Sequence, residues 1–302
     1  MEIDHALCRF RRDTRDHLGL IAAGYVYDLT AADVERFGSL QTWLRAAAGR
    51  PQAAIVEALA MAEHVTPIAT LDALLAGQGG LRILKPLDAQ EVWAFGVTYE
   101  QSREARMRES EEPTIYGRVY EAERPEVFFK ATPHRVVGPG EAVGIRGDSI
   151  WNVPEPELAF LVTPAFEIVG FTIANDMSSR DIEGQNPLYL PQAKVYDRCC
   201  ALGPVIRLAD GFDPLALRVT CTIERGESQA FVGSTHTSRI RRSLPELARY
   251  LGRCNSMPDG AYALTGTGVV PPDTFTLAAG DTVRITVDGL GELINPVVTL
   301  PV

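Results

Sequence analysis

The sequence is poor in the residues that build disulfide frameworks, zinc sites and membrane spans. Its 302 residues include five cysteines and five histidines, and no Cys-x-x-Cys pair or Cys/His ligand spacing occurs. So sparse and odd a set of cysteines argues against a disulfide scaffold and is typical of reduced thiols. The apolar runs are far too short to cross a bilayer. The first five residues lack the basic and apolar regions of a signal peptide, so we expect a cytoplasmic protein.

Basic residues are also fewer than acidic residues. The chain has 29 Lys and Arg residues against 39 Asp and Glu residues, and a formal net charge of −10. A surface of that sign argues against nucleic acid and anionic membranes as partners. An anionic substrate would therefore need a local metal ion, Lys or Arg. The 46% hydrophobic content is that of an ordinary globular protein with a large core.

The pattern of elements predicts two domains. Residues 1–85 are predicted to form a small N-terminal α/β domain, with a strand pair at 20–29, a helix over 31–37 capped by Thr30, and a second helix over 53–63. Glycines at 77, 79 and 80 mark the link to residues 86–302. No chemistry-bearing pattern lies in the first part, so we expect the second part to be the catalytic domain.

A pair of glutamates precedes the apolar run 158–162. Residues i and i+2 of a strand point to the same face, so Glu155 and Glu157 are predicted to aim both carboxylates at one spot. Such a pair is costly when buried unless a cation joins it, and oxygen ligands suit Mg²⁺, Mn²⁺ or Ca²⁺. Asp176, at the end of the next apolar strand, could add a third carboxylate. The alternatives are a solvated Glu-x-Glu on an edge strand and a turn or helix-cap role for Asp176.

Other polar residues suggest proton transfer nearby. Glu126 and Lys130 alternate with apolar residues and share one strand face, as an active pair or as an exposed ion pair. Lys194 lies in a loop fixed by prolines, where burial and the metal would lower its pKa, and the alternative is a surface lysine. The turn at 265–268 can present N–H groups to an anion. The charged run 101–112 is predicted to be a solvated helix or a mobile cover over a site.

Together these stretches resemble the fumarylacetoacetate hydrolase family, in the right order over residues 85–302. The resemblance is carried by Gly170-Phe-Thr-Ile-Ala-Asn-Asp-Met-Ser-Ser-Arg-Asp181, Glu155-x-Glu157, Gln192-Ala193-Lys194, Leu264-Thr265-Gly266-Thr267 and Gly280-Asp281-Thr282-Val283. It implies an α+β, mainly β fold: a mixed β-sandwich or roll with the small N-terminal α/β domain. It also implies Mg²⁺ (Mn²⁺ or Ca²⁺ possible) on Glu155, Glu157 and Asp176, and a homodimer or homotetramer.

Four further stretches, 91–100, 124–133, 153–159 and 183–192, resemble the branch of the family that dehydrates 2-keto-3-deoxy sugar acids. The implied reaction removes water from a 2-keto-3-deoxypentonate of the D-arabinonate or D-xylonate type and gives 2,5-dioxopentanoate. It would proceed through an enolate that the metal stabilises, as a step of pentose catabolism. The expected proton-transfer pair is Glu126 and Lys194. The expected substrate contacts are Thr98, Tyr99, Lys130 and Thr267.

Two other functions fit parts of the pattern. A C–C bond hydrolase of a 2,4-diketo acid, such as an acylpyruvate or a 2,4-diketo-3-deoxy sugar acid, would use the same metal. That reaction usually needs a His/Glu-type water activator, and residues 100–120 contain no histidine, which favours dehydration. The other alternative is a non-catalytic protein that binds a metal or a keto acid. Such a protein needs no proton-transfer groups like Glu126 and Lys194.

Overall fold

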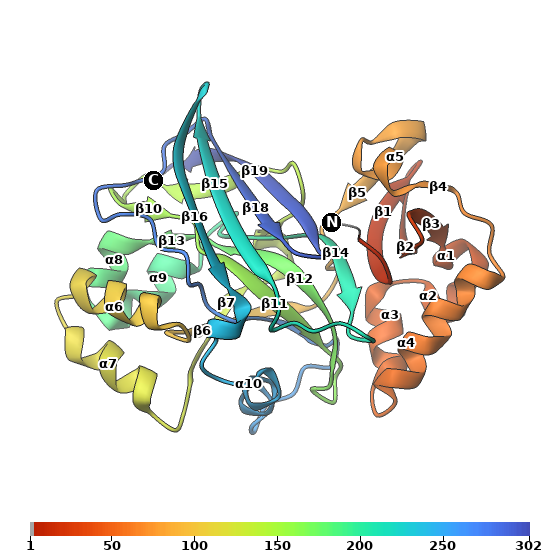
Figure 1. Cartoon of the computed structure of the whole chain (residues 1–302), viewed down its shortest axis with the longest axis horizontal. Helices are drawn as coiled ribbons and strands as arrows, with labels where there is room; N and C mark the ends of the chain where they lie inside the picture. The colour runs from red at the N-terminus through yellow and green to blue at the C-terminus, as the bar shows by residue number, and fades with distance from the viewer. Residues whose placement is uncertain (1–2) are drawn as a thin grey trace.

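A mixed sheet runs through most of the molecule in the computed structural model, which describes residues 3–302 (Figure 1). Twelve strands of these residues belong to it, with both parallel and antiparallel neighbours. Its strand order is β4 (Ala69–Thr70), β3 (Tyr25–Asp28), β2 (Arg15–Ala22), β1 (Ala6–Arg12), β14 (Cys200–Leu208), β12 (Ile168–Asp176), β11 (Pro156–Val162), β17 (Ala261–Leu264), β6 (Glu91–Gly96) and β7 (Glu126–Ala131), with β5 (Leu81–Leu84) beside β1 and β8 (Val136–Val137) beside β14.

A second sheet packs against the first through β15, β18 and β19, and the main hydrophobic core lies between the two. Its order is β16 (Ser228–His236), β15 (Arg218–Arg225), β18 (Asp281–Val287), β19 (Gly291–Leu300) and β9 (Val143–Arg146). In β18, alternation turns Val283, Ile285 and Val287 into the core. The predicted fold class, α+β with mixed sheets, is confirmed. A short ribbon of β10 (Asn152–Val153) and β13 (Ser178–Ser179) lies near the strand ends.

Helices lie around the two sheets. They are α1 (Leu29–Ala32), α2 (Val34–Phe37), α3 (Leu40–Ala47), α4 (Pro51–Ala60), α5 (Leu71–Leu75), α6 (Glu100–Glu109), α7 (Pro113–Glu121), α8 (Arg180–Gln185), α9 (Leu190–Lys194) and α10 (Leu244–Leu251). Short 3₁₀ helices are η1 (Met61–Glu63), η2 (Gln78–Gly80), η3 (Pro133–Arg135), η4 (Pro187–Tyr189) and η5 (Thr237–Arg239). Within residues 3–302, none of these helices has the length and apolar character needed to span a membrane.

The N-terminal segment extends the large sheet. Strand β1 pairs antiparallel with β14, with Ala6 opposite Arg207 and Leu7 opposite Ile206. Figure 1 shows the elements before residue 85, in red and orange, gathered at one end of the molecule. The division into domains at residue 85 stays a prediction, and the β1–β14 pairing describes how the two parts are joined.

The helix predicted over 31–37 is wrong in detail. Two short helices, α1 and α2, replace it and meet at Asp33, whose carboxylate accepts the Arg36 N–H and so starts a new helix. The cap of α1 is Asp28, which accepts the Ala31 N–H at 2.9 Å, rather than Thr30. The Thr30 hydroxyl instead donates to the Phe37 carbonyl at 2.7 Å.

Candidate functional site

Three carboxylates meet where β11 and β12 lie side by side. The antiparallel register sets Pro156 opposite Asn175, which brings Glu155, just before β11, next to Asp176 at the end of β12. The Asp176 N–H donates to the Glu155 carbonyl at 2.9 Å. One carboxylate oxygen each from Glu155, Glu157 and Asp176 lies within 4.8 Å of the others, and all three residues are buried. The structure thus brings together the three residues predicted to hold a cation.

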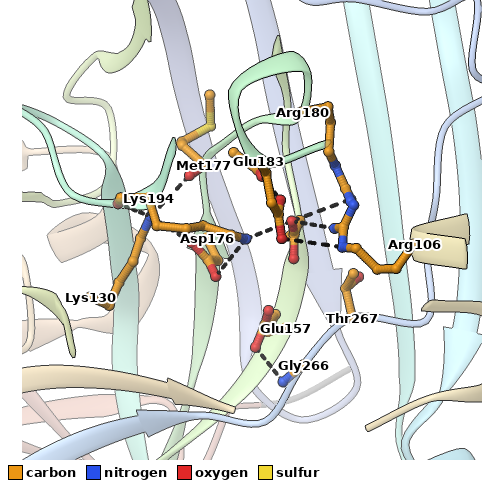
Figure 2. A network of polar contacts seen from close by, with 12 residues as sticks. Arg106, Lys130, Glu157, Asp176, Met177, Arg180, Glu183, Lys194, Gly266 and Thr267 are labelled. Carbon is orange, nitrogen blue, oxygen red and sulfur yellow. Dashed lines mark hydrogen bonds and ion pairs between the residues drawn. The ribbon is translucent and has the colours of Figure 1, made fainter. Parts of the chain in front are cut away.

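The Glu155 carboxylate is surrounded by positive charge. Its Oε1 atom lies 2.7 Å from Lys194 Nζ, 3.0 Å from Arg106 Nη2 and 3.2 Å from Arg180 Nη2. Figure 2 shows Arg106 and Arg180 approaching from one side of the cluster, with Lys194 on the other. These cations come from α6, α8 and α9, so Glu155 joins three helices to the end of the sheet. Buried charges of this kind are stable only when they are paired in this way.

Lys130 lies behind Asp176. Its Nζ is 2.5 Å from Asp176 Oδ1 and donates to the carbonyls of Met177 at 2.9 Å and Lys194 at 2.6 Å (Figure 2). The side chain is fully buried, and the Asp176 carboxylate raises its pKa above the ordinary value although burial acts to lower it. Lys130 therefore holds Asp176 and the end of α9 in place.

Glu157 has no cation within ion-pair distance among residues 3–302. Its Oε2 accepts the Gly266 N–H at 2.5 Å, so the predicted anion-binding turn at 265–268 binds a carboxylate of the chain itself (Figure 2). Gly266 is required there because its φ is +87° and a Cβ atom would overlap the Thr98 hydroxyl. Burial, together with the Asp176 and Glu155 carboxylates, raises the pKa of Glu157 well above its ordinary range.

Glu126 and Lys194 line the same small cavity as the three carboxylates. Glu126 is the first residue of β7 and lies against Gly96 of the neighbouring β6, where a side chain would overlap its carboxylate. Burial raises the pKa of Glu126 to about 7, with a further rise from Glu183, although Lys194 and Arg106 oppose it. A carboxyl that titrates near neutral pH suits proton transfer.

In the cation-free protein the pKa of Lys194 is raised, so the lowering expected from burial and a bound metal together stays a prediction. Burial does act to lower the pKa of this amine, but the carboxylates of Asp176, Glu155 and Glu183 outweigh it and raise the pKa above the ordinary value. The Nζ atom lies 2.7 Å from Glu155 and 3.1 Å from Asp176. The sequence pattern suggested burial but not that two carboxylates would face the amine.

The cavity has a free volume of about 20 Å³, room for about one water molecule. Thr267 lines it and donates its hydroxyl to the Pro156 carbonyl at 2.9 Å. The other three residues predicted to contact substrate, Thr98, Tyr99 and Lys130, are buried beside the cavity and do not line it. The residues that line it are Phe95, Gly96, Val97, Ser102, Arg106, Glu126, Phe128, Glu155, Glu157, Asp176, Glu183, Leu190, Lys194, Gly266 and Thr267.

Four charged residues of the site were missed from the sequence. Arg106 and Glu109 come from α6, and Arg180 and Glu183 come from α8. Glu109 Oε2 lies 2.5 Å from Arg106 and 3.0 Å from Arg180, while Glu183 Oε1 lies 3.4 Å from Arg106. The small residue Ala105 faces inward with them. The signal available in the sequence was that a small residue lies on the same side of the helix as Arg106 and Glu109. Such a side of a helix can pack closely and be buried.

The donor set and charge of this cluster fit a divalent cation. Three buried carboxylates offer the oxygen ligands that Mg²⁺ prefers, and Glu157 lacks a compensating cation among the described residues. Six carboxylates face four cationic groups, so full ionisation leaves two negative charges, which is the charge that one Mg²⁺ would balance. The carboxylates are Glu109, Glu126, Glu155, Glu157, Asp176 and Glu183, and the cations are Arg106, Lys130, Arg180 and Lys194.

The comparison with known families agrees with this architecture. The sequence model described as fumarylacetoacetate (FAA) hydrolase C-terminal matches residues 91–298. The chain belongs to the fumarylacetoacetate hydrolase family. The match spans every element that contributes to the cluster, from β6 to β19, and begins after the N-terminal strands.

Relatives within the fumarylacetoacetate hydrolase family include sugar-acid dehydratases. The chain is 54% identical over 216 residues to the "Probable 2-keto-3-deoxyxylonate dehydratase" of Haloferax volcanii, covering 71% of this chain and 74% of that protein. It is 48% identical over 225 residues to the 2-dehydro-3-deoxy-D-arabinonate dehydratase of Saccharolobus solfataricus, covering 72% and 74%. A solved 2-keto-3-deoxy-D-arabinonate dehydratase, complexed with magnesium and 2,5-dioxopentanoate, superposes with a TM-score of 0.81 at 36% identity, covering 98% of this chain and 100% of the other.

Proposed function

We propose that this chain is a Mg²⁺-dependent dehydratase that converts a 2-keto-3-deoxypentonate into 2,5-dioxopentanoate and water. The observation that carries the proposal is one cavity that holds Glu126 and Lys194 together with Glu155, Glu157 and Asp176. The identity to dehydratases of such acids, 54% and 48%, supports the choice of substrate class.

Glu155, Glu157 and Asp176 would hold Mg²⁺, and Mn²⁺ or Ca²⁺ would suit the same oxygen ligands. When bound, the ion supplies a Lewis acid that polarises the carboxylate and ketone oxygens of a 2-keto acid. Lys130 pairs with Asp176, and the Gly266 N–H binds Glu157, so two of the ligands are fixed before a cation arrives.

Glu126 and Lys194 are the proton-transfer pair of the proposed reaction. The proton on C3 of the substrate becomes acidic because the neighbouring ketone is polarised, and one of the two residues removes it. The C4 hydroxyl leaves as water after it receives a proton, and a C3–C4 double bond forms. Loss of a proton from C5 and gain of one at C3 then give an enol with a C4–C5 double bond. Loss of the proton of its C5 hydroxyl and gain of a proton at C4 give the aldehyde. Both side chains line the cavity, which is the geometry that such transfers require.

The proposed placement of substrate contacts follows from the cavity wall. Thr267 reaches the cavity directly, whereas Thr98, Tyr99 and Lys130 act on the substrate through the residues that they support. The Thr98 hydroxyl donates to the Thr265 carbonyl and so fixes the turn that carries Thr267.

We further propose that the enzyme works in the cytoplasm, in pentose catabolism, as a homodimer or homotetramer. The similarity to sugar-acid dehydratases supports the metabolic role, and five free cysteines support a reducing compartment. Light scattering of the purified protein at several concentrations would give the oligomeric state.

An enzyme assay tests the proposed reaction. The protein is incubated with Mg²⁺ and a 2-keto-3-deoxypentonate, and the aldehyde product is detected by NAD(P)⁺ reduction with a semialdehyde dehydrogenase. We expect turnover that EDTA abolishes and Mg²⁺ restores. Absence of turnover with both the D-arabinonate-derived and L-arabinonate-derived acids, in a sample that binds Mg²⁺, would contradict the proposal.

A further inference from the structure

The cavity at the carboxylate cluster is far smaller than the proposed substrate. Its free volume of about 20 Å³ accommodates about one water molecule, whereas a five-carbon sugar acid fills several times that space. Ser102 and Arg106 of α6 form part of the wall. The other walls are mainly strand ends and two helices: α8, which packs against the β10–β13 ribbon, and α9, which packs against β13 and β7. The wall formed by α6 is therefore the part that has to move.

Helices α6 and α7 form a cover that is fastened at its base. The Arg241 N–H donates to the Thr98 carbonyl at 3.0 Å, before α6 begins. The Arg241 guanidinium binds both oxygens of Glu121 at 3.0 and 2.8 Å, where α7 ends. Arg242 binds the Glu123 carbonyl at 3.0 Å. Arg241 is thus attached to both ends of the segment 98–123, Arg242 adds to the attachment at the second end, and the segment can pivot about this point.

The far end of the cover is held mainly by charge. Arg106 of α6 reaches the Glu155 carboxylate at 3.0 Å, and Glu109 of α6 reaches Arg180 at 3.0 Å. One backbone hydrogen bond, from the Glu111 N–H to the Gly184 carbonyl at 3.1 Å, adds to them. Ion pairs can exchange partners without the loss of a packed apolar interface, so this end can be released by a competing charge.

A divalent cation would compete with Arg106 for the Glu155 carboxylate. Three cations touch its Oε1 atom, but Lys194 also binds Asp176, and Arg180 is fixed by its own N–H, which donates to the Trp151 carbonyl at 2.7 Å. Arg106 is the cation that the cover supplies. A divalent ion bound to Glu155 would repel the Arg106 guanidinium at close range in a site of low dielectric.

We propose that Arg106 is the positioning residue of the α6–α7 cover: in the cation-free protein it neutralises Glu155 and holds the cover shut, and a divalent cation on Glu155 displaces it and opens the site to substrate. The inference rests on the proposed metal site and does not depend on which keto acid is turned over. It sets the order of events, because the cation then has to bind before the substrate.

Amide hydrogen exchange on the full-length protein tests this order, with Mg²⁺ alone as the probe. We expect Mg²⁺ to speed exchange within residues 100–109 on the order of tenfold or more, as the loss of a buried charged hydrogen bond predicts. In Arg106→Gln, exchange there should already be fast without Mg²⁺ and should change little on its addition. The matched control is Arg108→Gln, because Arg108 lies on the same helix and is exposed beside Asp273; it should respond as the wild type does.

A second variant and a parallel measurement make each outcome decisive. Arg106→Lys keeps the charge but loses the forked geometry, so exchange without Mg²⁺ should fall between the wild type and Arg106→Gln. Mg²⁺ binding is measured by calorimetry on the same samples, and we expect tighter binding in Arg106→Gln.

Mg²⁺ binding with unchanged or slower exchange in the wild type would overturn the role of Arg106 alone. No Mg²⁺ binding at all would overturn the metal site and the role of Arg106 together, whereas a failed dehydratase assay with intact binding and faster exchange would overturn only the proposed reaction.

Discussion

Gly96 leaves the space that the Glu126 carboxylate occupies. The two residues face each other across β6 and β7, and a Cβ atom on Gly96 would overlap the carboxylate of Glu126. The added Cβ atom would meet the end of the flexible Glu126 side chain and not backbone atoms. The protein can therefore accept a methyl group at position 96 if the Glu126 side chain turns aside. The position of a proposed proton-transfer group therefore depends on a residue that has no side chain.

Gly96→Ala should lower turnover without unfolding the protein. A displaced Glu126 no longer reaches the substrate, and loss of one acid–base group costs about 10²–10⁴-fold in kcat. Circular dichroism and Mg²⁺ binding should stay as in the wild type. Gly117→Ala is the matched control, because the added methyl group there makes only ordinary contact with Met107. Full activity of Gly96→Ala would contradict the proposed role of Glu126.

The pH dependence of kcat/KM should report Glu126. Its pKa is raised to about 7, mainly by burial. If Glu126 removes the C3 proton, it must be ionised, so the rate should rise as the pH increases through about 7. Glu126→Gln should lose this limb along with about 10²–10⁴-fold of the rate. A Glu126→Gln profile that keeps the limb would assign the titration to another group.

Glu126 should also destabilise the metal-free protein at high pH. A carboxyl whose pKa is higher in the folded state than in the unfolded state stabilises the fold below its unfolded pKa and loses that contribution as the pH rises through about 7. In EDTA at pH 8, Glu126→Gln should therefore be more stable than the wild type by about 1–3 kcal/mol. The difference should vanish near pH 4. Urea denaturation at the two pH values measures it, and equal stability at pH 8 would contradict the raised pKa of Glu126.

Cation binding should release protons. The pKa of Glu157 is raised well above its ordinary range by burial and by its carboxylate neighbours, so in the metal-free protein this carboxyl holds a proton to higher pH than an ordinary glutamate does, and Mg²⁺ competes with that proton. Calorimetry in two buffers of different ionisation enthalpy should show proton release, and Mg²⁺ affinity should fall as the pH is lowered. Glu157→Gln should weaken Mg²⁺ binding by at least about a hundredfold. Affinity that is independent of pH would place the metal elsewhere.

Lys194 should not form a Schiff base. Its Nζ is held 2.7 Å from Glu155 and 3.1 Å from Asp176, and these carboxylates raise the pKa of the amine, which keeps it protonated and poorly nucleophilic. Borohydride added during turnover should leave the mass of the enzyme unchanged. Lys194→Ala should lose turnover, and a borohydride-trapped adduct on the wild-type enzyme would instead assign Lys194 a covalent role.

Local patterns predicted the centre of the site, and tertiary packing determined its surroundings. Strand alternation predicted that Glu155 and Glu157 point to one spot, and their carboxylates do meet, although Glu155 lies one residue before β11. The closing hairpin with its Asp288-Gly289 turn also follows from local residues. The burial of Arg106 does not, since its partners outside α6 lie 49 and 77 residues away in the sequence. The pairing of β1 with β14 joins still more distant segments, and no periodicity specifies it.

A competition between two substrates, followed by NMR, tests the central claim most directly. The enzyme with Mg²⁺ is given equal amounts of a 2-keto-3-deoxypentonate and an acylpyruvate in one tube. We expect aldehyde signals of 2,5-dioxopentanoate, an intact acylpyruvate, and loss of the reaction in Glu126→Gln. Cleavage of the acylpyruvate into pyruvate and a carboxylic acid, with the sugar acid unchanged, would contradict it.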